Sequence, residues 1–237
     1  NSEQVVFFSG IAQTPNQQAI ADPLEALGSG NAVYDALVGL VGSNDDARAA
    51  FDSLTGEIHA SARTALLEDS RFPREAAMDR LRVTFGGVGA ENSDQIANRI
   101  SESFGIWGQG YGSWSRWNSN GNAAAMDRII GGIVMGGDAL VWDTARFGVL
   151  GGYSRSHVSV DDRASAGTAD TYTLGAYGGG EWDAVTLTGG MAHSWHSLDT
   201  SRSVAFSGFS DSLSASYSAR TLQAWAEAAY SFETGAA

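Results

Sequence analysis

From residue 106 onward the chain alternates apolar and small polar residues with a period of two. In 172–182, Tyr172, Leu174 and Trp182 fall on one side of an extended chain, and threonine and glycine fall on the other. Side chains alternate between the two faces of a strand, so this period predicts β-strands with one apolar face. Six strands are predicted, at about 106–117, 125–137, 147–160, 170–182, 184–197 and 212–232.

The predicted strands are long, and aromatic residues stand near their ends. Each has 12 residues or more, whereas a typical strand has about 5 or 6 and a tilted strand across a bilayer about 9 to 11. This pattern is typical of a membrane barrel with aromatic girdles and a polar lumen. A soluble β-sandwich also alternates and stays open as an alternative. The aromatic residues near strand ends are Trp107, Trp117, Tyr172, Trp182, Tyr230 and Phe232.

The predicted connections also differ in length. Trp182-Asp183-Ala184 forms a tight turn, whereas 161–169 and 198–211 are expected to be longer polar loops. Short turns on one side and longer loops on the other are typical of outer-membrane barrels. The 138–146 connection belongs on the short side, but it is not very short.

Before residue 105 the apolar residues recur with a helical period. The run 4–12 is expected to be a short strand, and Asp22-Pro23 to begin a helix, because proline is favoured at the first helical position. Segment 91–104 has an apolar stripe too narrow for a core helix, which predicts a solvated linker, with a helix in a polar channel as the alternative. The other predicted helices are the stripe Val33, Leu37, Leu40, Val41; the segment capped by Ser43 and Asp46; and residues 57–68 and 71–82.

Composition changes near the same point. All seven Trp and 20 of the 30 Gly lie beyond residue 105, and all three Pro lie before it. The net charge is −13, and all 14 basic residues are Arg. Because phosphate binding needs a basic surface, nucleic acid is not expected as a partner. The chain has no Cys and no apolar run long enough for a membrane helix, and it begins at Asn1 without a signal peptide, as an internal piece or a mature start would.

Arginines recur within the predicted strands, at Arg116, Arg128, Arg155 and Arg220. An arginine that faces lipid at the bilayer midplane costs about 2 to 4 kcal/mol, so these four are expected to face the lumen or to lie at its rim. Residues 1–105 carry 15 acidic and 7 basic residues. Lumenal arginines could therefore contact this acidic region, or they could be solvated pore charges without partners.

The residues that resemble catalytic groups do not form a recognisable site. His193 and His196 lie three apart on a predicted strand, hence on opposite faces, where they cannot share a metal. His157 near Asp161 and Asp162 is interpreted as a rim residue. No nucleophile elbow, P-loop or zinc-protease motif occurs. No catalytic, cofactor-binding or metal-binding residue is therefore assigned.

Several motifs together resemble the C-terminal region of bacterial autotransporters. They occur in the family's order, over about residues 12–233. Two lie in the helical region: Gly30-Asn-Ala-Val-Tyr-Asp-Ala-Leu37 and the run Gly56-Glu-Ile-His-Ala-Ser-Ala-Arg that continues to Arg82. Three lie among the strands: Trp107-Gly-Gln-Gly-Tyr-Gly-Ser-Trp114, Gly151-Gly-Tyr-Ser-Arg-Ser156 and Thr200-Ser-Arg-Ser-Val-Ala-Phe206.

The resemblance implies a mainly β fold, namely half of an antiparallel transmembrane barrel preceded by a helical linker region. Family barrels have twelve strands, with a linker helix in the pore, and here about six are expected. The expected parts are the end of a passenger at 1–14, the helical pre-barrel linker at 15–105 and the first six strands at 106–237. Some family members cut themselves between two Asn in the pore, but here Asn92-Ser93-Asp94 contains no such pair.

By the same resemblance, the chain is a non-enzymatic translocator that exports its own passenger. The implied location is the outer membrane of a Gram-negative bacterium, with the passenger at the cell surface. The implied partners are outer-membrane lipid, the passenger segment, periplasmic chaperones and the barrel-assembly machinery, and no cofactor is implied. Two alternatives stay open: an outer-membrane enzyme with His157, Asp161, Asp162 and His196 as its candidates at the rim, and a soluble β-rich adhesin module.

Overall fold

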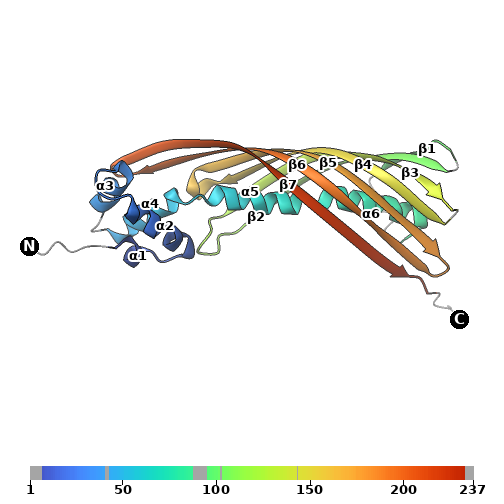
Figure 1. Cartoon of the computed structure of the whole chain (residues 1–237), viewed down its shortest axis with the longest axis horizontal. Helices are drawn as coiled ribbons and strands as arrows, with labels where there is room; N and C mark the ends of the chain where they lie inside the picture. Colours follow the sequence, from blue (N-terminus) through green and yellow to red (C-terminus); the bar gives the residue numbers. More distant parts are fainter. Residues whose placement is uncertain (1–6, 41–42, 88–94, 102, 143, 233–237) are drawn as a thin grey trace, which may run out of the picture.

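The computed structural model describes residues 7–40, 43–87, 95–101, 103–142 and 144–232, in which six helices precede seven strands (Figure 1). The helices are α1 (Phe8–Ile11), α2 (Pro15–Ala26), α3 (Ala32–Gly39), α4 (Asn44–Leu54), α5 (Glu57–Asp69) and α6 (Arg71–Phe85). The strands are β1 (Ile96–Arg99), β2 (Phe104–Trp117), β3 (Met126–Val141), β4 (Ala145–Val160), β5 (Ser165–Trp182), β6 (Val185–Phe206) and β7 (Phe209–Tyr230).

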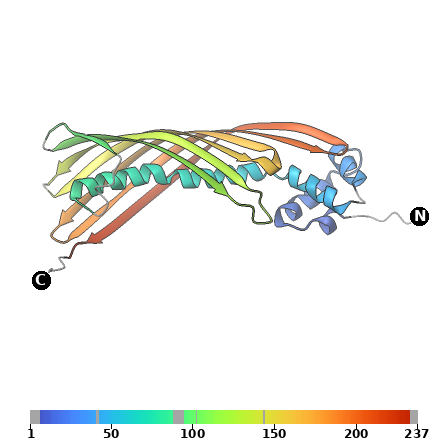
Figure 2. The same cartoon turned by 180° about the vertical axis from the view of Figure 1, so that it is seen from behind.

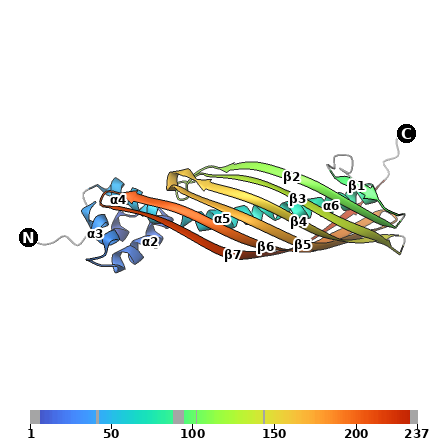
Figure 3. The ribbon, with the colours of Figure 1, turned by 90° about the horizontal axis from the view of Figure 1, so that it is seen from above.

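The strands form one open antiparallel sheet in the order β1 to β7. The mainly β class is confirmed, and the six long strands lie where the alternation predicts them. The sheet curves over α5 and α6, which run along its concave face (Figures 1 and 3). The two faces are also as predicted: Tyr172 and Leu174 are exposed on the convex face, whereas Thr171 and Thr173 are buried on the concave face.

The strands extend beyond the predicted limits into the segments expected to be loops. β5 begins at Ser165, and β6 and β7 continue to a two-residue turn between Phe206 and Phe209. The predicted loops 161–169 and 198–211 are therefore wrong over most of their length. A polar segment can form a strand when a neighbouring strand satisfies its backbone groups, and polarity alone gave no sign of this pairing. Likewise β3 runs to Val141 and β4 starts at Ala145, so this connection is short after all.

The segment 91–104 differs most from its prediction. Within the described residues, Ile96–Arg99 forms β1 and pairs antiparallel with β2, whereas a linker or a polar channel helix was expected. The edge of β2 offers unpaired backbone groups to any extended segment beside it, which explains a strand with so little apolar pattern. The remainder of the prediction falls partly on residues 91–94 and 102, which lie outside the described residues.

In the region before residue 87, the four predicted helical segments are confirmed. The strand predicted at 4–12, in its described part, and the helix start predicted at Asp22-Pro23 are wrong. Ser43 caps α4 as predicted, its hydroxyl accepting from the Asp46 N–H. The run 4–12 does not form the expected strand in its described part, because Phe8–Ile11 is helical and buries Phe8 and Ile11 among other helices. Helix α2 begins at Pro15, capped by Thr14, so Pro23 lies inside the helix instead of opening it. No helix in the described ranges is both long and apolar enough to cross a membrane.

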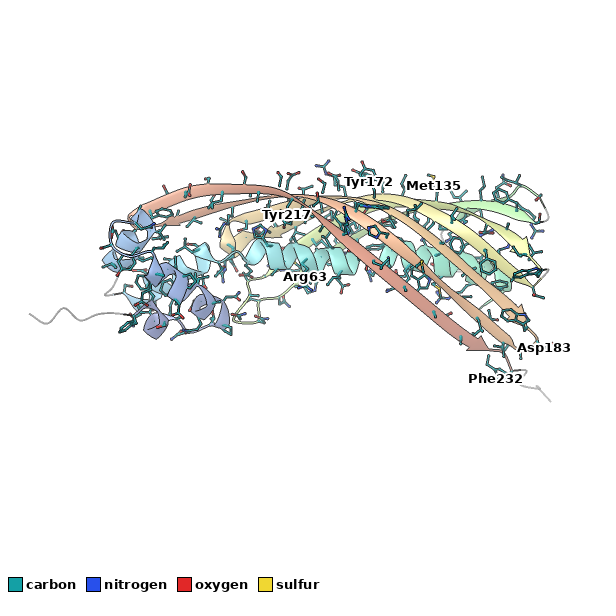
Figure 4. All side chains as sticks on the ribbon, viewed as in Figure 1. Arg63, Met135, Tyr172, Asp183, Tyr217 and Phe232 are labelled. Atoms are coloured by element: carbon teal, nitrogen blue, oxygen red, sulfur yellow. The ribbon has the colours of Figure 1, made fainter. Side chains whose placement is uncertain are left out.

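Helices α1 to α4 form a separate apolar cluster at one end of the sheet, here called the helical end (Figure 2). Phe8, Leu37 and Phe51 lie at its centre, and Phe206 from the tip of the β6–β7 hairpin packs against it. The opposite end, with the β3–β4 and β5–β6 turns, is called the turn end. Asp183 marks it in Figure 4.

Candidate functional site: a helical rod on the concave face of the sheet

Helices α5 and α6 follow each other almost without interruption and are here called the rod. Only Ser70 separates them, and it caps the end of α5 and precedes α6. The rod runs from the helical end to the turn end along the concave face (Figure 2). One face of each helix is buried against the sheet, so the rod occupies the space that the curved strands enclose.

Apolar contacts seat the rod at three levels. Near the turn end, Ala76, Ala77 and Leu81 pack against the sheet. Small alanines let the helix approach the strands closely, and close packing of this kind is what gives a buried contact its dispersion energy. The sheet residues at this level are Trp107, Val134, Leu150 and Tyr177. Ile58 and Ala65 pack on Val158 and Val160, and Ala62 and Leu66 pack on Ala169 and Leu198.

A buried carboxylate at Asp138 joins the rod to three strands. The Arg80 guanidinium donates to both of its oxygens at 2.7 and 3.0 Å, and Arg146 of β4 donates to it as well. The Tyr177 hydroxyl donates to it at 2.8 Å and accepts from the Trp107 indole at 2.5 Å. The Asp138 side chain is 0% exposed. Buried charges are stable only when they are paired and hydrogen-bonded, so these groups hold one another in place.

Glycines leave room for this network. A Cβ on Gly148 would lie 2.5 Å from the Tyr177 ring and 2.8 Å from Asp138, and a Cβ on Gly105 would lie 2.7 Å from Arg80. Real Cβ atoms do not approach neighbours so closely. Some of the glycine in the strands therefore makes space for inward-facing charged and aromatic side chains.

A second buried ion pair lies nearer the helical end. Arg128 of β3 donates to Asp69 at the end of α5, and both side chains are almost fully buried. The Trp117 ring lies 5.6 Å from the Arg128 guanidinium carbon. The expected contact between a lumenal arginine and the acidic region before residue 105 is thus confirmed at Arg128. The two buried pairs clamp the rod at two levels, and together they set its register along the strands.

The convex face carries an apolar belt bounded by aromatic residues. On β5 the belt runs from Tyr172 to Trp182 and on β6 from Val185 to Trp195, eleven residues and therefore ten steps along the strand in each case. At about 3.3 Å per residue and a tilt of about 40°, this length corresponds to a band about 25 Å tall. Met135 and Tyr172 project from this face in Figure 4. Trp114, Tyr153, Tyr172 and Trp195 bound it towards the helical end; Trp142, Trp182, Tyr230 and Phe232 bound it towards the turn end.

Two of the aromatic predictions were wrong. Trp107 and Trp117 face inward, where they contact Tyr177 and Arg128, and Trp114 takes the outward position on β2. The arginines follow the predicted rule, because none lies on the convex face inside the belt. Arg116 and Arg155 face outward beyond it, 3.5 and 3.9 Å from Asp127 and Asp170, and Arg220 lies at its boundary opposite Trp195.

Beyond the belt, polar contacts hold the start of the rod. Glu57 accepts from Arg163 at 3.1 Å and from the Ala124 N–H at 2.6 Å. Arg202 donates to the backbone carbonyls of Leu54 and Thr55, both at 3.0 Å. His59 lies 3.0 Å from the Tyr217 hydroxyl, whose pKa is raised by burial.

The side chains considered for catalysis are not brought together. His157 is exposed on the convex face, whereas His196 is buried on the concave face, bonded to Thr171 and Thr221 at 2.8 and 2.9 Å. Asp161 and Asp162 lie exposed in the turn between β4 and β5. His193 and His196 face opposite sides, as predicted. In the part of the chain that the structure describes, no three His, Asp or Glu side chains form a potential metal site.

The sequence reasoning missed the Asp138 network. Asp138 and Arg146 were assigned to a connection, so their inward direction could not be inferred. One signal was available: both are charged residues at the margins of strongly apolar, glycine-rich runs. Arg80 stands eleven residues after Asp69, which places two ionic residues on one side of a helix.

Comparisons with known proteins point in one direction. A model of the autotransporter beta-domain family matches residues 106–237. An extracellular serine protease of Serratia marcescens is 30% identical over 227 residues, which cover 96% of this chain and 20% of that protein. A second extracellular serine protease of Serratia marcescens is 32% identical over 222 residues, covering 94% of this chain and 20% of that protein. The chain thus spans about a fifth of the length of these relatives.

Proposed function

The chain belongs to the autotransporter family, and from this premise we propose that its curved sheet lies in the outer membrane as part of the wall of a pore through which the full-length protein exports its passenger. The translocator role follows from the family. The observation that supports the proposed path is the rod, which leads from the helical end along the concave face to the turn end. A polypeptide thus already lies along the route that an exported segment would take.

The belt supports the proposed placement in lipid. Its height of about 25 Å matches the apolar band of outer-membrane barrels. The turn end, where β5 and β6 stop at the edge of the belt, is assigned to the periplasmic side. The helical end, where β6 and β7 extend well beyond the belt, is assigned to the cell surface. In this orientation α1 to α4 lie outside the membrane, at the surface side of the pore.

The proposed passenger precedes the rod. We keep 1–14 as its expected end, 15–105 as the pre-barrel region and 106–237 as the wall. The relatives are named extracellular serine proteases, so a secreted protease is the first passenger activity to test. Catalysis is proposed to belong to the passenger and not to this chain. The proposed partners are lipid, the passenger, periplasmic chaperones and the barrel-assembly machinery.

The test uses the full-length protein in a Gram-negative host and measures passenger at the cell surface by its sensitivity to added protease. Ala176→Arg places a charge near the middle of the belt, on the same face as Tyr172 and Leu174, and a charge at the midplane costs about 2 to 4 kcal/mol in lipid. We expect this variant to lose most surface passenger. The matched control is Thr168→Arg, which faces the same way on β5 but lies beyond the belt and should export normally. Equal export by the two variants would show that the belt does not contact lipid.

A further inference from the structure

Two arginines stand on the convex face just beyond the belt, on the side of the helical end. Arg116 of β2 and Arg155 of β4 face outward, and their side chains are 66% and 65% exposed. The turn end has no counterpart on β2 to β7 in the part of the chain that the structure describes, because Arg146, the arginine near that end, is buried against Asp138. Outward-facing arginine therefore marks only one margin of the belt.

The protein itself leaves both guanidinium groups without a close acceptor. The nearest carboxylates, Asp127 and Asp170, lie 3.5 and 3.9 Å away, whereas a charge-assisted hydrogen bond measures about 2.7 to 2.9 Å. Asp170 accepts instead from the Tyr153 hydroxyl, at 2.6 Å. Every other arginine that forms an ion pair among the described residues also hydrogen-bonds to a carboxylate. The N–H groups of Arg116 and Arg155 thus point to an acceptor outside the chain.

The sheet surface between the two arginines is bare. Arg155 lies opposite Gly131 of β3, which in turn lies opposite Gly112 of β2, and both glycines face outward. A Cβ on Gly131 would meet nothing within 4 Å. From the spacing and rise of strands, the Cα atoms of Arg116 and Arg155 are about 16 Å apart. Two extended arginine side chains can span most of this distance and leave room for a headgroup between them.

An exposed indole borders the same surface. Trp114 is 79% exposed and lies two residues from Arg116 on the same face of β2. His157 of β4 is in line with it, since both are opposite Ile129 of β3. Tryptophan at a bilayer margin lies at the level of the lipid headgroups. Its flat apolar face stacks well on the C–H groups of a sugar ring. The surface formed by Trp114, Arg116, Gly131, Arg155 and His157 is here called the arginine patch.

We propose that the arginine patch binds a phosphorylated glycolipid, whose phosphate monoester is held by Arg116 and Arg155 and whose sugar stacks on Trp114. The inference rests on the proposed function, which places this margin in the outer half of the bilayer. Because the patch continues the belt, one lipid can lay its acyl chains on the belt and its headgroup on the patch. Guanidinium groups bind phosphate through two parallel hydrogen bonds.

The charge of the patch favours a monoester over a diester. Asp127 and Asp170 offset part of the arginine charge, even though they form no hydrogen bond with it. A phosphate monoester carries a charge of about −1.5 to −2 at pH 7, whereas the diester of a phospholipid carries a single charge. The monoester therefore competes better with the two carboxylates, and it offers more acceptor oxygens.

The test uses the full-length protein in neutral detergent micelles, titrated with lipid A, a disaccharide lipid with phosphate monoesters. Native mass spectrometry measures the bound fraction. The double variant Arg116→Gln, Arg155→Gln should bind about ten to a hundred times more weakly, because it loses hydrogen bonds to a charged group. The matched control, Arg63→Gln with Arg74→Gln, removes the same charge from the rod and should bind like the unmodified protein. Tryptophan fluorescence and surface passenger verify that each variant is folded.

Lipids of other chemistry identify the source of the phosphate. Dephosphorylated lipid A should bind the unmodified protein as weakly as lipid A binds the double variant with Arg116→Gln and Arg155→Gln. Phosphatidylglycerol, a diester, should bind weakly to both proteins. Equal binding of lipid A by the two proteins would overturn the proposal, and so would a preference for phosphatidylglycerol. Failure of the proposed function would appear separately, as normal export by the Ala176→Arg variant.

Discussion

At the scale of single residues, the structure is organised around charges that the sheet buries. Asp138 has no exposed side-chain surface, yet it lies in a strand whose convex neighbours belong to an apolar belt. A carboxylate in such a place is tolerable because two arginines and a tyrosine hydroxyl donate to it. Its position, not its residue type, distinguishes it from the other acidic residues of the chain.

Asp138→Ala should be strongly destabilising in the full-length protein. The change leaves Arg80 and Arg146 buried without their counter-ion, which costs about 3 to 5 kcal/mol in the free energy of unfolding. Urea unfolding in detergent micelles, followed by tryptophan fluorescence, measures the loss. Glu227→Ala is the control, because it breaks a half-exposed pair with Arg82 and should cost about 0 to 1 kcal/mol. A similar loss in both variants would contradict the assigned role of Asp138.

Gly148→Ala should also destabilise the protein, for a steric reason. The added methyl group has no space beside Tyr177 and Asp138, and overpacking of this kind costs about 1 to 3 kcal/mol. Gly110→Ala adds the same methyl group on the convex face of β2, where nothing lies within 4 Å. The same unfolding measurement should show little change for Gly110→Ala. If both variants unfold alike, Gly148 has another role.

At the scale of elements, the β6–β7 hairpin does two tasks in one pair of strands. The part of the hairpin towards the turn end belongs to the belt. The other part continues beyond Trp195 and Leu222 to reach the helical end. There Phe206 packs against the cluster of α1 to α4, and Arg202 holds the backbone at the end of α4. The hairpin therefore connects the sheet to the helical cluster.

Phe206→Ala should loosen α1 to α4 without unfolding the sheet. If the loss of the Phe206 ring weakens the packing of the α1–α4 cluster by about 1.4 kcal/mol, the equilibrium constant for local opening of this cluster rises about tenfold. Hydrogen exchange of the α1–α4 amides should therefore accelerate about tenfold, while the exchange of β3 to β5 stays unchanged. Ser203→Ala, an exposed position on the same strand, serves as the control. Unchanged exchange in the Phe206 variant would show that other contacts hold the cluster.

At the scale of the whole molecule, the distribution of polarity is the reverse of that in a soluble protein: apolar side chains are exposed and charged ones are buried. Its convex surface exposes Ile133, Met135, Leu174, Met191 and Leu222, whereas its concave side buries ion pairs. Soluble proteins rarely expose an apolar surface of this extent. Lipid on one side and the rod on the other explain both features together.

Removal of detergent should therefore cause association. Because the belt cannot be hydrated without cost, the full-length protein purified in micelles should form large particles on dilution below the critical micelle concentration. Light scattering measures the particle size. The control is the same dilution into buffer that keeps the detergent above its critical micelle concentration. A stable monomer without detergent would favour the soluble adhesin interpretation.

Local periodicity determined much of this protein. Alternation with a period of two assigned the faces of β5 and β6, and the helical period located α5 and α6, because both signals reside in neighbouring residues. Tertiary structure decided the rest. Ile96–Arg99 became a strand because β2 offered an edge, and the polar ends of β6 and β7 paired because each satisfied the other's backbone. Asp138 met Arg80 and Arg146 only because the sheet folded over the rod. Such contacts depend on partners far apart in the chain, and no local pattern encodes them.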